Sequence, residues 1–140
     1  MITVWTNGVF DLLHVAHVSL LERSKALGDK LIVGLNSDAA TARLKPGRPI
    51  YPYDDRRQML MALESVDLVV PIEDDPREVL AWLRPDIVVK GRGYDPATMI
   101  EAETVAAYGG RIVILPSDDA ISTTNTLAKL RGLEDGSRVS

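Results

Sequence analysis

Two histidines lie three residues apart in the segment T-N-G-V-F-D-L-L-H-V-A-H, which runs from Thr6 to His17. Apolar, β-forming residues precede this segment and leucines at helical spacing follow it, so the sequence predicts a strand, a turn and a helix. Gly8 suits the turn because glycine adopts backbone angles that other residues avoid. A helix N-terminus presents unpaired N–H groups and partial positive charge, and His14 and His17 would share one face beside it. We interpret this arrangement as a site for a nucleotide phosphate, although two surface histidines in an ordinary α/β domain would show the same spacing.

Two basic side chains further along the chain suit the same anion. Residues 39–50 are polar and basic, and we expect a loop there from which Lys45 could neutralise a phosphate; simple solvation of this lysine is the alternative. Arg56 lies near the start of a helix predicted over residues 54–64, where a cation opposes the helix dipole. An external anion would explain that position, and so would a nearby carboxylate such as Asp54 or Asp55.

Two more segments place polar groups where ligands of parallel sheets bind. Lys90 and Gly91 directly follow a strand predicted over residues 86–89, and open α/β sheets bind ligands beyond the carboxyl ends of their strands. Hydroxyl residues before the last predicted helix are either ordinary N-caps or phosphate ligands, namely Ser122, Thr123 and Thr124.

Strand and helix patterns alternate along the chain. The predicted strands cover residues 1–5, 30–35, 66–72, 86–89 and 111–115, and the helices between them include residues 54–64, 79–83 and 98–108. This alternation predicts one Rossmann-like, doubly wound α/β domain over residues 1–132, followed by a flexible tail over 133–140. We expect a five-stranded parallel sheet of order 3-2-1-4-5 with helices on both faces. The site should lie where the strand order reverses, beyond the ends of the first and fourth strands.

Composition excludes several classes of protein. The 140 residues are 46% hydrophobic and 26% charged, which is typical of a globular domain, and the net charge of −4 argues against a general binder of nucleic acid or of anionic membranes. The chain has no cysteine, so disulfides and thiolate metal sites are excluded. No apolar run approaches the ~20 residues of a membrane span, so we expect a cytoplasmic enzyme or binding module.

The histidine segment resembles the G-x-F-D-x-x-H-x-G-H signature of the cytidylyltransferase-like nucleotidyltransferases. The matching residues are Gly8, Phe10, Asp11, His14 and His17. The segments V-G-L-N-S-D-A, R-L-K, A-L-E-S-V-D, R-P-D-I-V-V-K-G and S-T-T-N are similar to the heptose 1-phosphate adenylyltransferase subgroup, without the sugar kinase half of its bifunctional members. This resemblance implies transfer of an adenylyl group from ATP to a sugar 1-phosphate, with D-glycero-D-manno-heptose 1-phosphate as the expected acceptor. The products would be an ADP-sugar and pyrophosphate.

The resemblance also implies roles for individual residues. His14, His17 and Lys45 would be catalytic, binding phosphates and stabilising the charge of the transition state. The nucleotide would be bound by both histidines and by Thr6, Asn7, Gly8, Val9, Phe10, Lys90, Gly91, Ser122, Thr123 and Thr124. Contacts to the acceptor are implied for Asp11, Asn36 and Arg56. Mg²⁺ would accompany ATP, held by phosphate and water because no protein ligands are evident, and a homodimer is common in the family.

Departures from the family pattern leave alternatives open. Ala16 replaces the second glycine of the signature, and Gly93 stands where the heptose enzymes carry an acid, so a nucleotide-binding module with weak catalysis is one alternative. Ser117 and Asp118 replace an arginine-containing pattern of the glycerol-phosphate cytidylyltransferases, which favours ATP over CTP. A cytidylyltransferase acting on glycerol 3-phosphate or a polyol phosphate is the second alternative.

Overall fold

The computed structural model describes residues 1–91, 93–95, 97–116 and 130–131. In chain order the elements are β1 (Thr3–Gly8), α1 (Val15–Lys25), β2 (Lys30–Asn36), α2 (Asp38–Leu44), α3 (Tyr53–Met61), β3 (Leu68–Ile72), α4 (Arg77–Leu83), β4 (Ile87–Lys90), α5 (Ala102–Ala107) and β5 (Arg111–Ile114). The longest of these helices, α1, has 11 residues, and none of the described helices has the length and hydropathy to cross a membrane. The predicted hydroxyl cap (Ser122, Thr123 and Thr124), Ser117, Asp118 and the tail over 133–140 lie outside the described residues.

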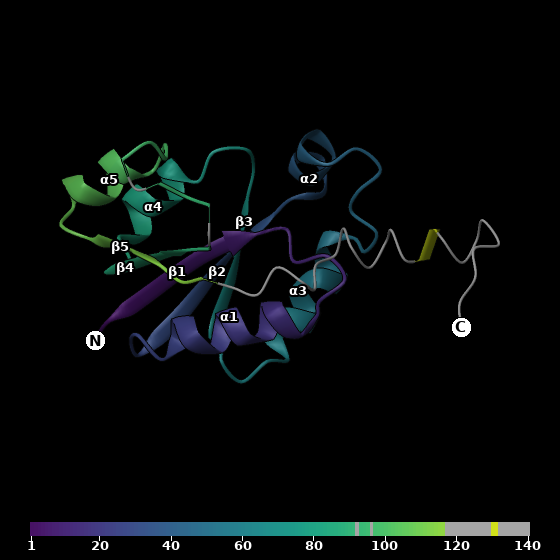
Figure 1. The fold of residues 1–140 in the computed structure, drawn as a ribbon, viewed down its shortest axis with the longest axis horizontal. Coiled ribbons are helices and arrows are strands. Elements are labelled where there is room, and N and C mark those ends of the chain that lie inside the picture. Colours follow the sequence, from purple (N-terminus) through teal and green to yellow (C-terminus); the bar gives the residue numbers. More distant parts are fainter. Residues whose placement is uncertain (92, 96, 117–129, 132–140) are drawn as a thin grey trace.

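The five strands form one parallel sheet in the order β3-β2-β1-β4-β5, which confirms the predicted topology. β1 is central: it pairs with β2 on one side and with β4 on the other (Figure 1). The chain first builds outward through β2 and β3, then crosses over β1 to build β4 and β5. The order therefore reverses between β1 and β4, and the carboxyl ends of these two strands lie at one edge of the sheet.

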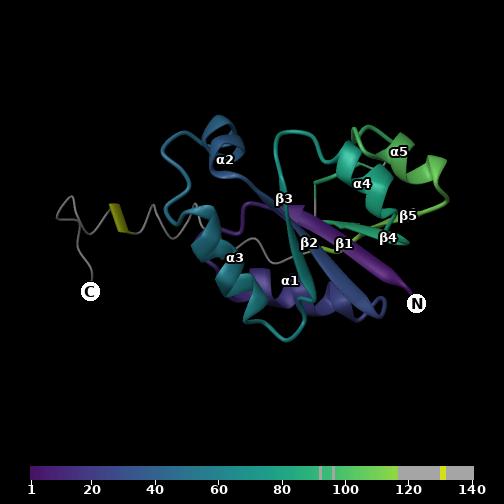
Figure 2. The ribbon, with the colours of Figure 1, turned by 180° about the vertical axis from the view of Figure 1, so that it is seen from behind.

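Helices cover both faces of the sheet. α1 and α3 lie on one face, and α4 and α5 lie on the other (Figures 1 and 2). Because successive strand residues point to opposite faces, Val4 packs in the core beneath α1 and α3, whereas Trp5 packs in the core with α4 and α5. The Trp5 ring also explains a glycine in β2, since a Cβ atom at Gly34 would lie 2.4 Å from it.

One predicted loop is wrong over half of its length. Residues 39–50 were expected to be a loop, but Asp38–Leu44 form helix α2. The Ser37 side chain caps this helix by accepting a hydrogen bond from the Ala40 N–H, and Ala40 and Thr41 are buried. Of the basic residues in this stretch, Arg43 and Lys45 are exposed, whereas Arg48, in the turn after the helix, is buried. Lys45 is the C-cap of α2 and remains exposed.

Candidate active site at the ends of β1 and β4

The turn between β1 and α1 is left-handed at two positions, neither of them glycine. Phe10 has a φ of 48° and Leu12 a φ of 53°, whereas Gly8 has no positive φ. The expectation that Gly8 supplies the unusual angle is therefore wrong. Gly8 instead provides space, because a Cβ atom there would lie 3.2 Å from the Phe10 ring. Positive φ is costly for bulky residues, so the surrounding contacts must hold this turn in place.

The two histidines cap α1 reciprocally. His14 is the N-cap: its Nδ1 accepts a hydrogen bond from the Ala16 N–H, while the His14 N–H donates to Nδ1 of His17. The imidazole rings stack with centroids 3.9 Å apart, and Phe10 meets the edge of His17 at 5.3 Å. A neutral imidazole whose Nδ1 accepts must carry its proton on Nε2. Each ring therefore keeps one N–H donor, on Nε2, that the cap does not use, in the N-terminal turn of a helix, where an anion is favoured.

Burial keeps both imidazole rings neutral near pH 7, because it disfavours their charged form. Burial, together with the smaller effects of His14 and Lys45, lowers the pKa of His17 from 6.5 to about 4. Burial also lowers the pKa of His14. Lys45, predicted to be catalytic, is near enough for its charge to lower the pKa of His17.

We expect the stability of the protein to fall as the pH drops below 7. The unfolded chain protonates His17 near pH 6.5, but the folded chain does so only near pH 4, so the unfolded state binds more protons between these values. The stabilisation is complete above the unfolded pKa and is lost as the pH falls. Between pH 7 and pH 5 the free energy of unfolding should decrease by about 2 kcal/mol. Urea titrations across this range measure the slope, and His17→Asn should remove most of it; an equal slope in that variant would contradict the assignment.

A cavity of about 380 Å³ opens beside the ends of β1, β2 and β4. Lys90, at the end of β4, is buried in its wall, donates to Asn7 Oδ1 at 2.8 Å and pairs with Glu101 Oε2 at 2.8 Å. Asn7 Oδ1 also accepts from Trp5 Nε1 at 3.2 Å, which fixes the orientation of the Asn7 amide. Asn36 lines the same cavity and is 7% exposed, and its Oδ1 has no hydrogen-bond partner among the residues that the structure describes. A buried oxygen without a partner is costly, so this atom is suited to accept a hydrogen bond from a ligand.

Other predicted site residues are tied to the protein itself. Thr6 Oγ1 donates to the Val89 carbonyl, and the Val9 carbonyl accepts from Arg56. Arg56 is completely buried, and Asp11 is 1% exposed with its carboxylate bonded to residues 48–51. Gly91 follows β4, and a Cβ atom there would meet no atom of the described residues within 4 Å. The structure therefore places the predicted residues of its described part along one edge of the sheet, as three neighbouring groups: the histidine pair, the cavity and a buried hub around Arg56.

Comparisons with known proteins agree with this architecture. The sequence profile described as Cytidylyltransferase-like matches residues 5–129. This chain belongs to the cytidylyltransferase-like family. Membership confirms the predicted family and the expectation of a nucleotidyltransferase enzyme.

Individual relatives and solved structures are similar to this chain over most of its length. The chain is 48% identical over 130 residues to the bifunctional protein HldE of Salmonella arizonae and equally to that of Salmonella paratyphi B. The match covers 91% of this chain but only 27% of each relative, so the chain spans about a quarter of their length. A solved lipopolysaccharide core biosynthesis protein of Thermoplasma volcanium is 30% identical with a TM-score of 0.70, covering 84% of this chain and 97% of that one. A pantoate-beta-alanine ligase of Francisella tularensis, 12% identical over 90% of this chain and 65% of its own with a TM-score of 0.59, shares the fold.

The family signature did not point to two residues of this site. Arg48 bonds to Asp11, and Glu101 bonds to Lys90; both residues are buried, as are their partners. Buried charges of opposite sign are the signal that could have identified them, but their burial is visible only once the chain is folded. Among the described residues of this cytidylyltransferase-like chain, no cluster of three His, Asp or Glu side chains could hold a metal ion. Asp11, the carboxylate of the signature, is bonded to Arg48 and two backbone amides, so the described residues do not fit a protein-bound Mg²⁺.

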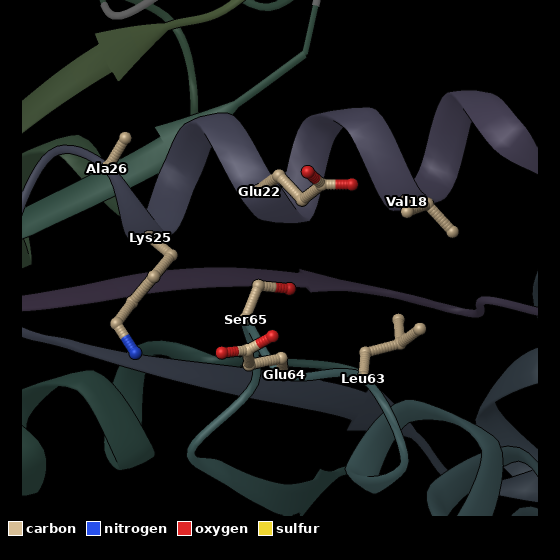
Figure 3. A pocket seen from close by; sticks show the side chains of 7 residues that line it. All are labelled: Val18, Glu22, Lys25, Ala26, Leu63, Glu64 and Ser65. Carbon is tan, nitrogen blue, oxygen red and sulfur yellow. The ribbon is translucent and has the colours of Figure 1, made fainter.

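A larger hollow of about 540 Å³ lies away from this edge, between α1 and residues 63–65 (Figure 3). Its walls carry Glu22 and Lys25 from α1 and Glu64 and Ser65 from the segment before β3. Among the described residues that line it, none was predicted as a site residue of the cytidylyltransferase-like signature. Size alone therefore does not identify the active site of this chain.

Proposed function

We propose that this protein transfers the adenylyl group of ATP to the phosphate of a sugar 1-phosphate, releasing pyrophosphate and forming an ADP-sugar. The observation that supports this most strongly is the pair of neutral imidazoles, each with an Nε2–H donor, at the N-terminus of α1 beside Lys45. The identity to HldE and the likeness to a lipopolysaccharide core biosynthesis protein favour a heptose 1-phosphate as the acceptor.

The chemistry needs few protein groups. An oxygen of the acceptor phosphate attacks the α-phosphorus of ATP, and the bond from that phosphorus to the bridging oxygen of the β-phosphate breaks. The acceptor phosphate is already an anion, so no general base is required, and catalysis consists of positioning and charge neutralisation. In this proposal, His14 and His17 donate to phosphate oxygens and Lys45 neutralises charge that develops on the leaving pyrophosphate. The substrate is ATP with its own Mg²⁺.

We propose the cavity between β1, β2 and β4 for the sugar. Its buried charges cancel, because Lys90 is paired with Glu101. The other charged residues that line it, Asp74 and Asp95, are exposed carboxylates that can accept hydrogen bonds. Asn36 Oδ1 accepts no hydrogen bond from the described part of the chain, and Asn7 Oδ1 accepts from Trp5 and Lys90, which orients the Asn7 amide. Such a wall suits the hydroxyl groups of a neutral sugar ring, with the phosphate directed toward the histidines.

A pyrophosphate-release assay tests the function. ATP, CTP, GTP and UTP are each incubated with heptose 1-phosphate, mannose 1-phosphate and glycerol 3-phosphate. We expect release with ATP that depends on a sugar 1-phosphate. Release with CTP and glycerol 3-phosphate would establish the cytidylyltransferase alternative instead. Tight ATP binding without release with any acceptor would identify a nucleotide-binding module.

A further inference from the structure

Asp11 is hydrogen-bonded to the segment that follows Lys45. Its buried carboxylate accepts hydrogen bonds from Arg48 Nε at 2.8 Å, from the Ile50 N–H at 2.6 Å and from the Tyr51 N–H at 3.1 Å. Burial alone would raise the pKa of Asp11, but these three donors outweigh it and the pKa is lowered, so the carboxylate stays charged. The Arg48 N–H in turn donates to the Lys45 carbonyl at 3.0 Å. The histidine turn is thereby bonded to the segment that begins directly after Lys45.

Arg56 holds the chain that precedes Lys45. Its guanidinium is 0% exposed, and Nη2 donates to Asp38 Oδ1 at 2.7 Å, on the first residue of α2. Nη1 donates to the carbonyls of Val9 and Asn36, both at 2.9 Å, and Nε donates to the Tyr51 carbonyl at 2.9 Å. One side chain thus joins the ends of β1 and β2 to the start of α2, the seven-residue helix that Lys45 caps.

We infer that Asp11 and Arg56 are positioning residues, which fix the Lys45 segment beside His17 from its two flanks instead of contacting the substrate. The bonds described above occupy both side chains with this task, and the burial of Arg56 leaves it no surface for a ligand. The inference rests on the proposed function in one respect: that function makes Lys45 a catalytic group, which Asp11 and Arg56 would position. The arrangement also stabilises the strained turn at Phe10 and Leu12, because Asp11 lies between them and Arg56 binds the Val9 carbonyl.

The pKa of His17 reports the position of Lys45 without any substrate. The chain has two histidines, so proton NMR resolves both imidazoles during a pH titration. Positive charge on Lys45, or on His14 when it is protonated, lowers the pKa of His17. Lys45→Met should raise it by roughly half a unit, because one nearby positive charge is removed. Asp11→Asn and Asp38→Asn should each raise it as well, and Asp11→Asn should add nothing in the Lys45→Met background.

The direction of this change is diagnostic. Removing the negative charge of Asp11 or Asp38 would by itself lower the pKa of a nearby imidazole, so a rise must come from displacement of Lys45. Asp67→Asn is the matched control: Asp67 also accepts from a cation, Lys25, and from a backbone N–H, but far from the site, and its loss should leave the pKa of His17 unchanged. A lowered or unchanged pKa of His17 in both Asp11→Asn and Asp38→Asn would overturn the inference.

A second variant keeps the test decisive if Asp11→Asn does not fold. Inserting two glycines after Gly47, an exposed position with nothing within 4 Å of a Cβ atom, leaves every side chain in place but slackens the link from Arg48 to Lys45. The pKa of His17 should rise here too, and an unchanged value overturns the inference. Pyrophosphate release is measured separately: absent release with a raised pKa would refute the proposed function alone, and release with an unchanged pKa would refute only the positioning role.

Discussion

His17→Asn is expected to lower kcat for pyrophosphate release by 10²–10³-fold, the range seen when one positioned donor to a transition-state oxyanion is removed. The asparagine Oδ1 lies close to where the imidazole Nδ1 stands, so it can still accept from the His14 N–H and cap α1. The variant has no group at the position of Nε2, which is the proposed donor to phosphate. Activity should therefore fall without a matching loss of stability at pH 7, measured as initial rates at saturating substrate and as a urea midpoint.

His17→Gln is the comparison variant for this experiment. Its longer side chain places the amide near the position of Nε2, so it should recover part of kcat while capping α1 less well. The two substitutions should therefore distinguish the role of Nδ1 in capping α1 from the proposed role of Nε2 as the donor to phosphate. If His17→Asn kept kcat within tenfold of the native value, His17 would be a capping residue only, and the proposed mechanism would be wrong.

The fold was predictable because its signals are local. Apolar runs such as residues 30–35 and 111–115 identified strands β2 and β5, and their alternation with helical patterns indicated a parallel sheet. The role of His14 and His17 at the start of a helix also follows from spacing within one turn. α2 was missed because its signal is weak: a serine cap and two buried small residues within a basic stretch.

The buried hub could not be predicted because its bonds join distant parts of the chain. Asp11 and Arg48 are 37 residues apart in the sequence. Their contact depends on left-handed backbone angles at Phe10 and Leu12, and the sequence has no glycine at either position to indicate such angles. A basic residue near a helix start, such as Arg56, was consistent with an external anion or a carboxylate partner. The structure supplies the carboxylate from Asp38, on a helix the sequence did not indicate. Family resemblance suggested substrate contacts for the same residues, and only the burial of Arg56 favours a different role.

Replacing Arg56 by methionine should therefore cost about 3–5 kcal/mol of the free energy of unfolding, because several acceptors that are at least partly buried lose a charged donor at about 1–3 kcal/mol each. Methionine fills much of the space but donates no hydrogen bonds, so the carbonyls of Val9, Asn36 and Tyr51 lose their donor from Arg56. Domains of this size are stable by only about 5–15 kcal/mol, so the variant should be close to unfolding at 37 °C.

The next residue provides the control for this last prediction. Arg57 lies on the same turn of α3 but is exposed, so Arg57→Met should change the free energy of unfolding by no more than about 0.5 kcal/mol. Urea unfolding of both variants at pH 7 measures the difference. Equal losses would mean that the buried bonds of Arg56 do not stabilise the fold. A large loss confined to Arg56→Met would show that the end of β1, the start of α2 and the segment before α3 are held together by one buried cation, on which the geometry beside the histidines depends.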